Sequence, residues 1–233
     1  MDKKSENRFF LLIKKNKITI TVLSHTKEFI LTKEIFFKNY SLNEIYNLLE
    51  NFLDKNILQI EKDLKIFIKN INIIFESDNF FLAETSIKQK FKINNINQNQ
   101  IKDSLIDIRS QFDKYSPGYE IIHMVINKYL VDGHVFKSLP ENIYQDNLVI
   151  QIDFVCLDNQ IIQNLKDILS RYQISINKIL SYDYLRKLYN PNNENIIKIA
   201  NDNIDGFYAN EVLMAEKTSK NQSFFEKFFN YFS

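Results

Sequence analysis

The spacing of apolar residues switches repeatedly along the chain between every second residue and every third or fourth, and this switching restricts the fold class. The segment NLVIQIDFVCL alternates strictly, which predicts a strand whose buried side carries Leu148, Ile150, Ile152 and Phe154. The next segment, NQIIQNLKDILSRYQ, has helical spacing and predicts an amphipathic helix. Strands interleaved with helices, with alternation typical of antiparallel pairing, indicate an α+β fold.

The same two patterns locate the other elements. Further strands are expected in RFFLLIK, KITITVLS, KEFILTKEIFF, KNINIIFES, FFLAETSIKQKF, YEIIHMVINKYLVDG, ISINKIL and FYANEVLMAEK. Helices are expected in SLNEIYNLLENFLDKNI, NQNQIKDSLIDIRSQFDKY and SYDYLRKLY. Ser41, with Glu44 three residues later, has the pattern of a capping box at the first of these helices. Residues 192–203 are polar and are expected to form a loop or a weak helix.

Glycine is scarce, and this argues against nucleotide binding. The 233 residues include three glycines, Gly118, Gly133 and Gly206, and none lies in a G-x-G-x-x-G or G-x-x-x-x-G-K-[ST] pattern. A phosphate cradle usually needs backbone amides brought close by glycine turns at the start of a helix. The sequence therefore predicts no bound nucleotide cofactor.

Residues capable of catalysis are present only singly. The histidines, His25, His123 and His134, lack metal-ligand spacing, and His123 lies in an apolar strand where a structural role is expected. Cys156 ends an apolar strand and is expected to be inertly packed. Asp103 and Asp107 fall on the exposed face of a predicted helix. We therefore expect no catalytic residues and no metal site, and a net charge of +1 gives no indication of nucleic-acid binding.

The cellular compartment follows from the single cysteine and from the hydropathy of the chain. With Cys156 alone, no internal disulfide can form, which fits a reducing compartment. The opening MDKKSENRFFLLIKKNK is too short an apolar run for a signal peptide or a spanning helix. A cytosolic protein is expected, unless its end contacts a membrane.

The stretch from Tyr119 to Tyr189 resembles the bacterial cell-division protein FtsA, of the actin-like family. In that family a strand ending in Asp-Gly leads to a loop with a proline, and then to a strand, a helix and a further strand. The matching positions here are Ile122-His123, Lys128-Tyr129, Val131-Asp132-Gly133, Pro140, Leu148 to Phe154, Asn164-Leu165, Ile174 to Ile179, and Ser181. The match covers about a third of the chain, and its order is more specific than any single motif.

The resemblance implies an actin-like first lobe with a small α+β subdomain inserted into it. By analogy, residues 7–67 and 176–216 are the remnant of the lobe, and residues 68–175 are the inserted subdomain. The family's two phosphate loops are not matched, because LIKKNKI and NPNNENIIKIANDNID stand in their places. The second lobe, which carries the family's groove for the tubulin-like FtsZ, has no counterpart, so FtsZ binding is expected only by another route.

The C-terminal residues SFFEKFFNYFS suggest a membrane-binding helix. On a helical wheel their phenylalanines lie within an arc of roughly 140°. The resemblance implies the same arrangement, a linker at 217–222 and an amphipathic helix at 223–233. The expected membrane-binding residues are Phe224, Phe225, Phe228, Phe229, Phe232 and Lys227. Packing of this segment onto the folded body and binding in a protein groove remain alternatives.

Together these features predict a membrane-associated, non-catalytic adaptor of the cell-division machinery. It is expected on the cytoplasmic side of the inner membrane at the division site, in contact with divisome proteins or with its own copies. Two alternatives remain open. One is the cytoplasmic actin-like component of a pilus-assembly machine, and the other is an ATPase that retains activity on a degenerate site.

Overall fold

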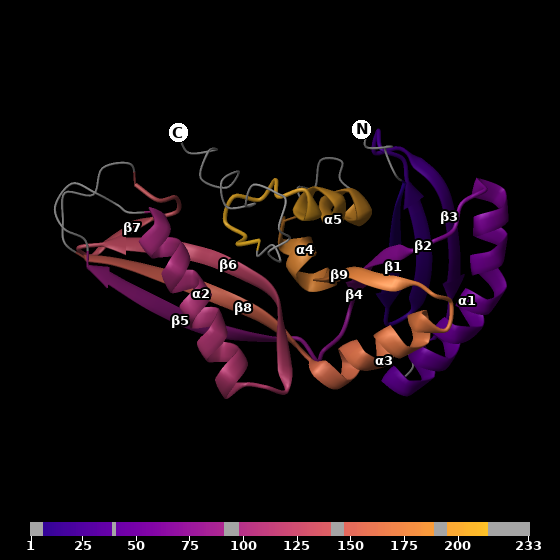
Figure 1. Ribbon diagram of the computed structural model, residues 1–233, viewed down its shortest axis with the longest axis horizontal. Helices are drawn as coiled ribbons and strands as arrows, with labels where there is room; N and C mark the ends of the chain where they lie inside the picture. Colours follow the sequence, from indigo (N-terminus) through magenta and orange to yellow (C-terminus); the bar gives the residue numbers. More distant parts are fainter. Residues whose placement is uncertain (1–6, 39–40, 91–97, 141–146, 189–194, 214–233) are drawn as a thin grey trace. The chain divides into compact units, whose positions relative to one another are not determined.

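The chain folds into two compact units, each described by itself. The computed structural model describes residues 7–38, 41–90, 98–140, 147–188 and 195–213 (Figure 1). The first unit comprises residues 1–80 and 159–204, and the second comprises residues 81–158 and 205–233. The expected linker at 217–222 and helix at 223–233 lie outside the described residues.

A five-stranded mixed sheet forms the centre of the first unit. Its order is β3-β2-β1-β4-β9, with bounds Phe29–Phe36, Lys17–Leu23, Arg8–Lys14, Asn70–Phe75 and Ser175–Ser181. The β1–β2 and β2–β3 pairs are antiparallel, whereas β1–β4 and β4–β9 are parallel. All but the first residue of β4 are buried, as expected for a central strand covered on both faces.

The described part of the first unit includes the helices α1 (Leu42–Leu64), α3 (Asn159–Ser170), α4 (Tyr182–Leu188) and α5 (Ile196–Ile204). The capping box at α1 is confirmed, because Ser41 accepts from the Glu44 amide and the Glu44 carboxylate accepts from the Ser41 amide. Figure 1 shows α1 and α5 on opposite sides of the sheet. The buried side chains Ile18, Ile20 and Val22 alternate along β2 with Thr19 and Thr21, which face α5.

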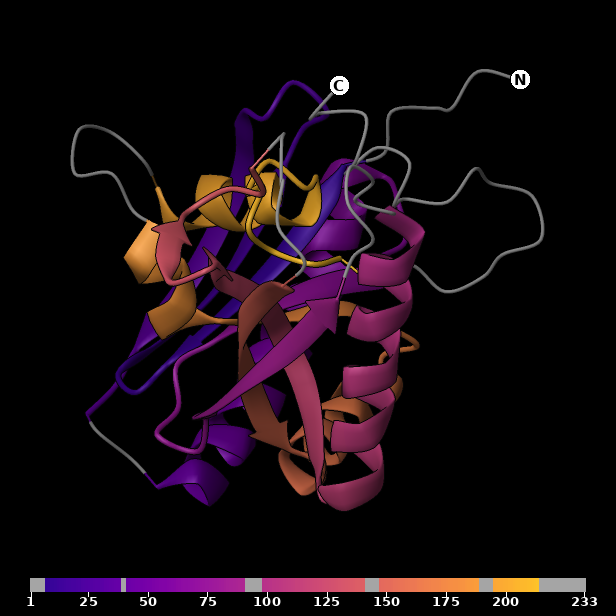
Figure 2. The same ribbon diagram turned by 90° about the vertical axis from the view of Figure 1, so that its left-hand side faces the viewer.

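In its described residues, the second unit is a four-stranded antiparallel sheet with one helix. Its order is β5-β8-β6-β7, with bounds Phe81–Lys90, Asn147–Asp158, Tyr119–Val131 and His134–Phe136. Helix α2 (Gln98–Tyr115) lies along one face (Figure 2). Its residues Ile101 and Leu105 join a core with the predicted inward face of β8, including Leu148, Ile150, Ile152 and Phe154.

The α+β class is confirmed, and most predicted elements occur in the expected order. Three details refine or differ from the expectation. Residues 196–204, expected as a loop or a weak helix, form a helix with a well-buried face; β7 was not expected; and the described part of FYANEVLMAEK, residues 207–213, gives a single bridge, Val125 to Glu211. Asn201 and Asn203 turn inward on α5, so a polar composition concealed its buried side.

The observed units also differ in their bounds from the expected subdomain at 68–175. Strand β4 and helix α3 fall inside that range but belong to the first unit, because β4 pairs with β1 and β9 and α3 packs against β9. At the other end, residues 205–213 belong to the second unit, where they lie along β6. Among the described residues, every helix is too short or too polar to span a bilayer.

Candidate functional site

Strands β1, β4 and β9 are parallel, so their carboxyl ends meet at one edge of the first sheet. Ligands of α/β sheets usually bind outside such an edge. The turn between β1 and β2 lies there, and the residues after β4 lie beside it. This is also where the resemblance would place a first phosphate loop.

Acidic side chains occupy this turn. The Lys15 amide donates to Oε2 of Glu76 at 3.1 Å, and Nζ of Lys15 binds both oxygens of Asp78 at 2.7 Å. The hydrogen bond to Asp78 raises the pKa of Lys15, and the charges of Asp78, Glu76 and Asp183 add to it. The turn amide that could approach a phosphate is therefore already bonded to a carboxylate.

The neighbouring lysine is engaged as well. Nζ of Lys14 donates to the hydroxyl of Tyr182 at 3.2 Å and lies 4.6 Å from the centre of the same ring. The guanidinium carbon of Arg186 lies 6.0 Å from the centre of the Tyr182 ring. Both cations of the turn thus have partners within the first unit, and the neighbouring carboxylates would repel a phosphate.

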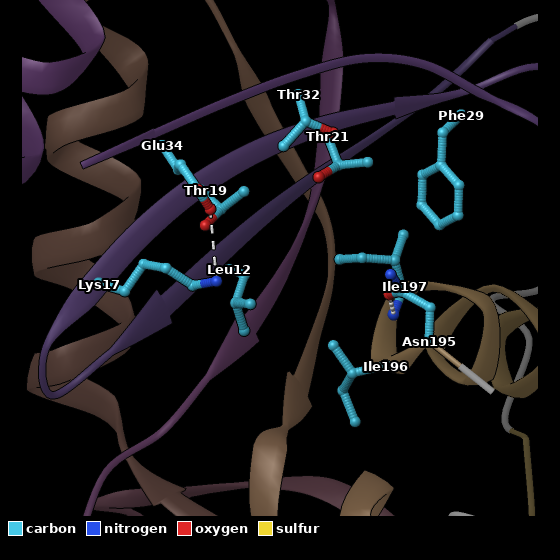
Figure 3. A pocket seen from close by; sticks show the side chains of 10 residues that line it. All are labelled: Leu12, Lys17, Thr19, Thr21, Phe29, Thr32, Glu34, Asn195, Ile196 and Ile197. Carbon is cyan, nitrogen blue, oxygen red and sulfur yellow. Dashed lines mark hydrogen bonds and ion pairs between the residues drawn. The ribbon is translucent and has the colours of Figure 1, made fainter. Parts of the chain in front are cut away.

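A second candidate is a cavity of about 270 Å³ between the face of the first sheet and the start of α5 (Figure 3). Its wall includes apolar side chains and a row of hydroxyls on β2 and β3. The lining residues are Leu12, Lys17, Thr19, Thr21, Phe29, Thr32, Glu34, Asn195, Ile196 and Ile197. The volume is slightly below the range typical of small-molecule pockets.

Several polar groups of this cavity are paired with one another. Lys17 is paired with Glu34 at 3.4 Å, and Asn195 caps α5 by accepting from the Ile197 amide at 2.9 Å. The buried hydroxyl of Thr19 has no hydrogen-bond partner among the described residues. An ordered water or a polar ligand atom would satisfy it. The lining contains no cysteine or histidine that could act as nucleophile or base.

Helix α5 is held over this face by side chains from β1, from β3 and from the turn between β2 and β3. Arg8 donates to Oδ1 of Asn201 at 2.8 Å, and Lys27 pairs with Asp202 at 2.6 Å. Nζ of Lys198 lies 5.7 Å from the ring centre of Phe29. These contacts attach three residues of α5 to the rest of the first unit, and they hold in place the part of the cavity wall that α5 forms.

In the second unit, His123 is buried, as the apolar strand predicted. Its Nδ1 lies 2.7 Å from Oε1 of Glu211, which is also buried. The adjoining backbone forms a short ladder, because Ile126 donates to Asn210 at 2.7 Å and Val212 donates to Met124 at 2.8 Å. This arrangement fastens residues 210–212 to the edge of β6.

The other residues that the sequence singled out for possible chemistry do not come together in one site. Cys156 is fully buried, and burial raises the pKa of its thiol to about 12, with the Asp113 charge adding to the effect. His25 and His134 are exposed, as are Asp103 and Asp107 on α2. Within the described ranges, no three histidine, cysteine or acidic side chains gather closely enough to hold a metal ion.

The predicted membrane residues Phe224, Phe225, Lys227, Phe228, Phe229 and Phe232 lie outside the described part of the chain. Sequence reasoning missed Glu76, Asp78 and Glu211. The first two directly follow the strand KNINIIF, a position that could have singled them out. Glu211 lies beside an apolar pair, and its partner is 88 positions away.

No family model and no curated protein matches this chain. Similar solved structures include the PilM–PilN type IV pilus biogenesis complex, at 6% identity and a TM-score of 0.46, covering 78% of this chain and 49% of that one. A second is the cytoplasmic domain of EpsL, an inner-membrane component of the type II secretion system of Vibrio cholerae. It is 12% identical with a TM-score of 0.34, over 77% of this chain and 57% of that one.

A third is a Bacteroides thetaiotaomicron protein with an actin-like ATPase fold and unknown function. It is 9% identical with a TM-score of 0.34, over 80% of this chain and 56% of that one. The chain therefore spans about half the length of these structures. At such identities the likeness concerns the fold alone.

Proposed function

We propose that this chain is a non-catalytic adaptor that recruits proteins to the cytoplasmic face of a membrane. The observation that carries the proposal is the occupied β1–β2 turn, where the Lys15 amide is bonded to Glu76 and its ammonium to Asp78. A turn closed by carboxylates is a poor phosphate site, so binding rather than nucleotide hydrolysis is the expected activity.

The membrane part of the proposal rests on the sequence of the C-terminal segment. Five phenylalanines on one face of a helix would insert into the headgroup region, with Lys227 near anionic lipids. A segment this short would bind weakly and reversibly, and several copies on one assembly would bind strongly. The tail would set location, and the folded units would contact partners.

Two kinds of machine are candidates for the adaptor. The first is a pilus-assembly or secretion machine, the systems named for two of the similar structures. The second is the division machinery, which is favoured by the matched order of residues from Tyr119 to Tyr189. In the second case FtsZ would be bound by a route other than the family's usual groove.

A fluorescent fusion of the full chain in living cells tests the proposal. Wild type should line the cell membrane, and its foci should coincide with pilus or secretion machines in the first case and with the septum in the second. Phe228→Glu should disperse the signal. A wild-type fusion spread evenly through the cytoplasm would contradict the proposal.

A further inference from the structure

Within the described part of the chain, strand β5 forms an unpaired edge of the second sheet. It lies at the end of the strand order, and β8 is its one strand partner among the described residues. Their register runs without interruption from Phe81–Cys156 to Lys90–Asn147. A ten-residue edge strand with no bulge and no proline is able to pair with another strand.

The two edge strands of the first sheet, β3 and β9, are less suited to pairing. Strand β3 pairs with β2 through a register shift at Val22–Leu23, and β9 pairs with β4 through a register shift at Ile71–Asn72; shifts of this kind twist an edge. Glu34 of β3 is already bonded to Lys17. Strand β5 is therefore the better candidate for pairing with another chain.

The charges on β5 provide a reason for it to pair. In the β5–β8 register, Glu84 lies directly opposite Asp153, so two carboxylates face each other across the ladder. Directly opposed like charges destabilise a sheet. Asn127 donates to Asp153 at 3.2 Å, but an amide does not neutralise the pair. A cation on the open side of Glu84 would relieve this repulsion.

Strand β5 itself carries a suitable cation, Lys88. Ala83 and Ile87 pack against the core, whereas Leu82, Glu84, Ser86 and Lys88 alternate with them on the exposed face. Glu84 and Lys88 are therefore equally far from Ser86 on the same face. An antiparallel neighbour of identical sequence, related by a two-fold axis at Ser86, would place its Lys88 opposite Glu84 and its Glu84 opposite Lys88.

We infer that a second copy of this chain pairs with the first along β5, antiparallel and centred on Ser86, to form one continuous eight-stranded sheet. The interface is isologous, since each copy contributes the same strand. Core-facing residues also match, with Thr85 opposite the partner's Ile87. The inference does not depend on the proposed adaptor function.

Such an interface should be weak in solution. Exposed ion pairs contribute little, and the main gain is the ladder of backbone hydrogen bonds. Copies held on one surface would associate at a far higher effective concentration. Self-association of the purified chain is therefore expected at high protein concentration.

Disulfide trapping of the purified full chain tests the two-fold axis directly. Opposed residues in an antiparallel pair have Cα atoms roughly 4.5–5.5 Å apart, which suits a disulfide. Ser86→Cys should therefore form a covalent dimer under mild oxidation, since the native Cys156 is buried and unreactive. The matched control is Leu82→Cys, whose two copies would be roughly 27 Å apart in this register and should remain monomeric.

Charge reversal tests the same register by a second route. Glu84→Lys and Lys88→Glu should each weaken dimerisation roughly five- to tenfold in sedimentation analysis, because like charges then oppose each other twice. The double variant should return to the wild-type value. Glu84→Lys should not lower the melting temperature, because it removes the repulsion from Asp153.

The following results would contradict the inferred pairing along β5. A Ser86→Cys protein that gives no covalent dimer at concentrations where wild type associates would overturn the inference. Equal trapping of Leu82→Cys would do the same, as would a dimer insensitive to both reversals. A wild-type chain that stays monomeric at the highest attainable concentration, with no trapping of Ser86→Cys, would also contradict it.

Discussion

Nδ1 of His123 lies 2.7 Å from Oε1 of Glu211, and both side chains are buried in the second unit. The two residues are 88 positions apart, and Glu211 forms a bridge with Val125 on β6. A buried carboxylate next to an imidazole holds the C-terminal end of the described chain on the sheet. The described part of the chain therefore ends on the second unit.

Removing the Glu211 carboxylate should destabilise the second unit. Glu211→Ala leaves a buried imidazole nitrogen without its acidic partner, and such a loss costs about 1–3 kcal/mol. Urea unfolding measures the cost, and faster hydrogen exchange at the Ile126 and Val212 amides would locate it. Glu211→Gln, which keeps a hydrogen-bonding oxygen, should lose less. Equal stability of Glu211→Ala and wild type would show that the pair is not an anchor.

The Cys156 thiol should be unreactive in the native protein. Burial raises its pKa to about 12, so the thiol remains protonated at pH 8 as well as lacking access to reagents. A disulfide-forming thiol reagent at pH 8 should label no cysteine in the folded chain and one per chain in urea. Rapid stoichiometric labelling without denaturant would contradict the packing described for β8.

The C-terminal phenylalanines should mediate attachment to lipid vesicles. Phe228→Glu replaces a ring near the middle of the apolar arc with a carboxylate that resists burial, so flotation with vesicles should be largely lost. Asn230→Lys, on the polar face, should retain flotation or strengthen it on anionic vesicles. Both variants should melt at the wild-type temperature. If Phe228→Glu floats normally, or melts many degrees lower, the segment packs on protein instead.

Local patterns were predictable from the sequence, whereas long-range pairings were not. The capping box at Ser41 and the alternation along β8 depend on residues a few positions apart, and both were correctly predicted. The parallel pairing of β4 with β1 and β9 joins distant segments, so the subdomain bounds expected at 68–175 differ from the observed units. Helix α5 was underestimated because its inward Asn201 is polar and is bonded to Arg8.

At the candidate site too, the sequence indicated local features but not long-range pairings. The missing glycines predict that the β1–β2 turn lacks a phosphate cradle, but they give no sign of the carboxylates that bind Lys15 there. Glu76 and Asp78 reach the turn because β4 lies parallel to β1, a pairing that periodicity does not reveal. The hydroxyl row in the cavity likewise depends on the β2–β3 register.

Calorimetric titration of the purified full chain with Mg-ATP tests the central claim most directly. The claim is that the carboxylates at the β1–β2 turn leave no phosphate site, so that the chain acts by binding proteins and not by hydrolysing nucleotide. Near-millimolar Mg-ATP should give no saturable heat. A saturable isotherm with a micromolar dissociation constant, weakened by a substitution at the turn such as Lys15→Ala, would contradict the account.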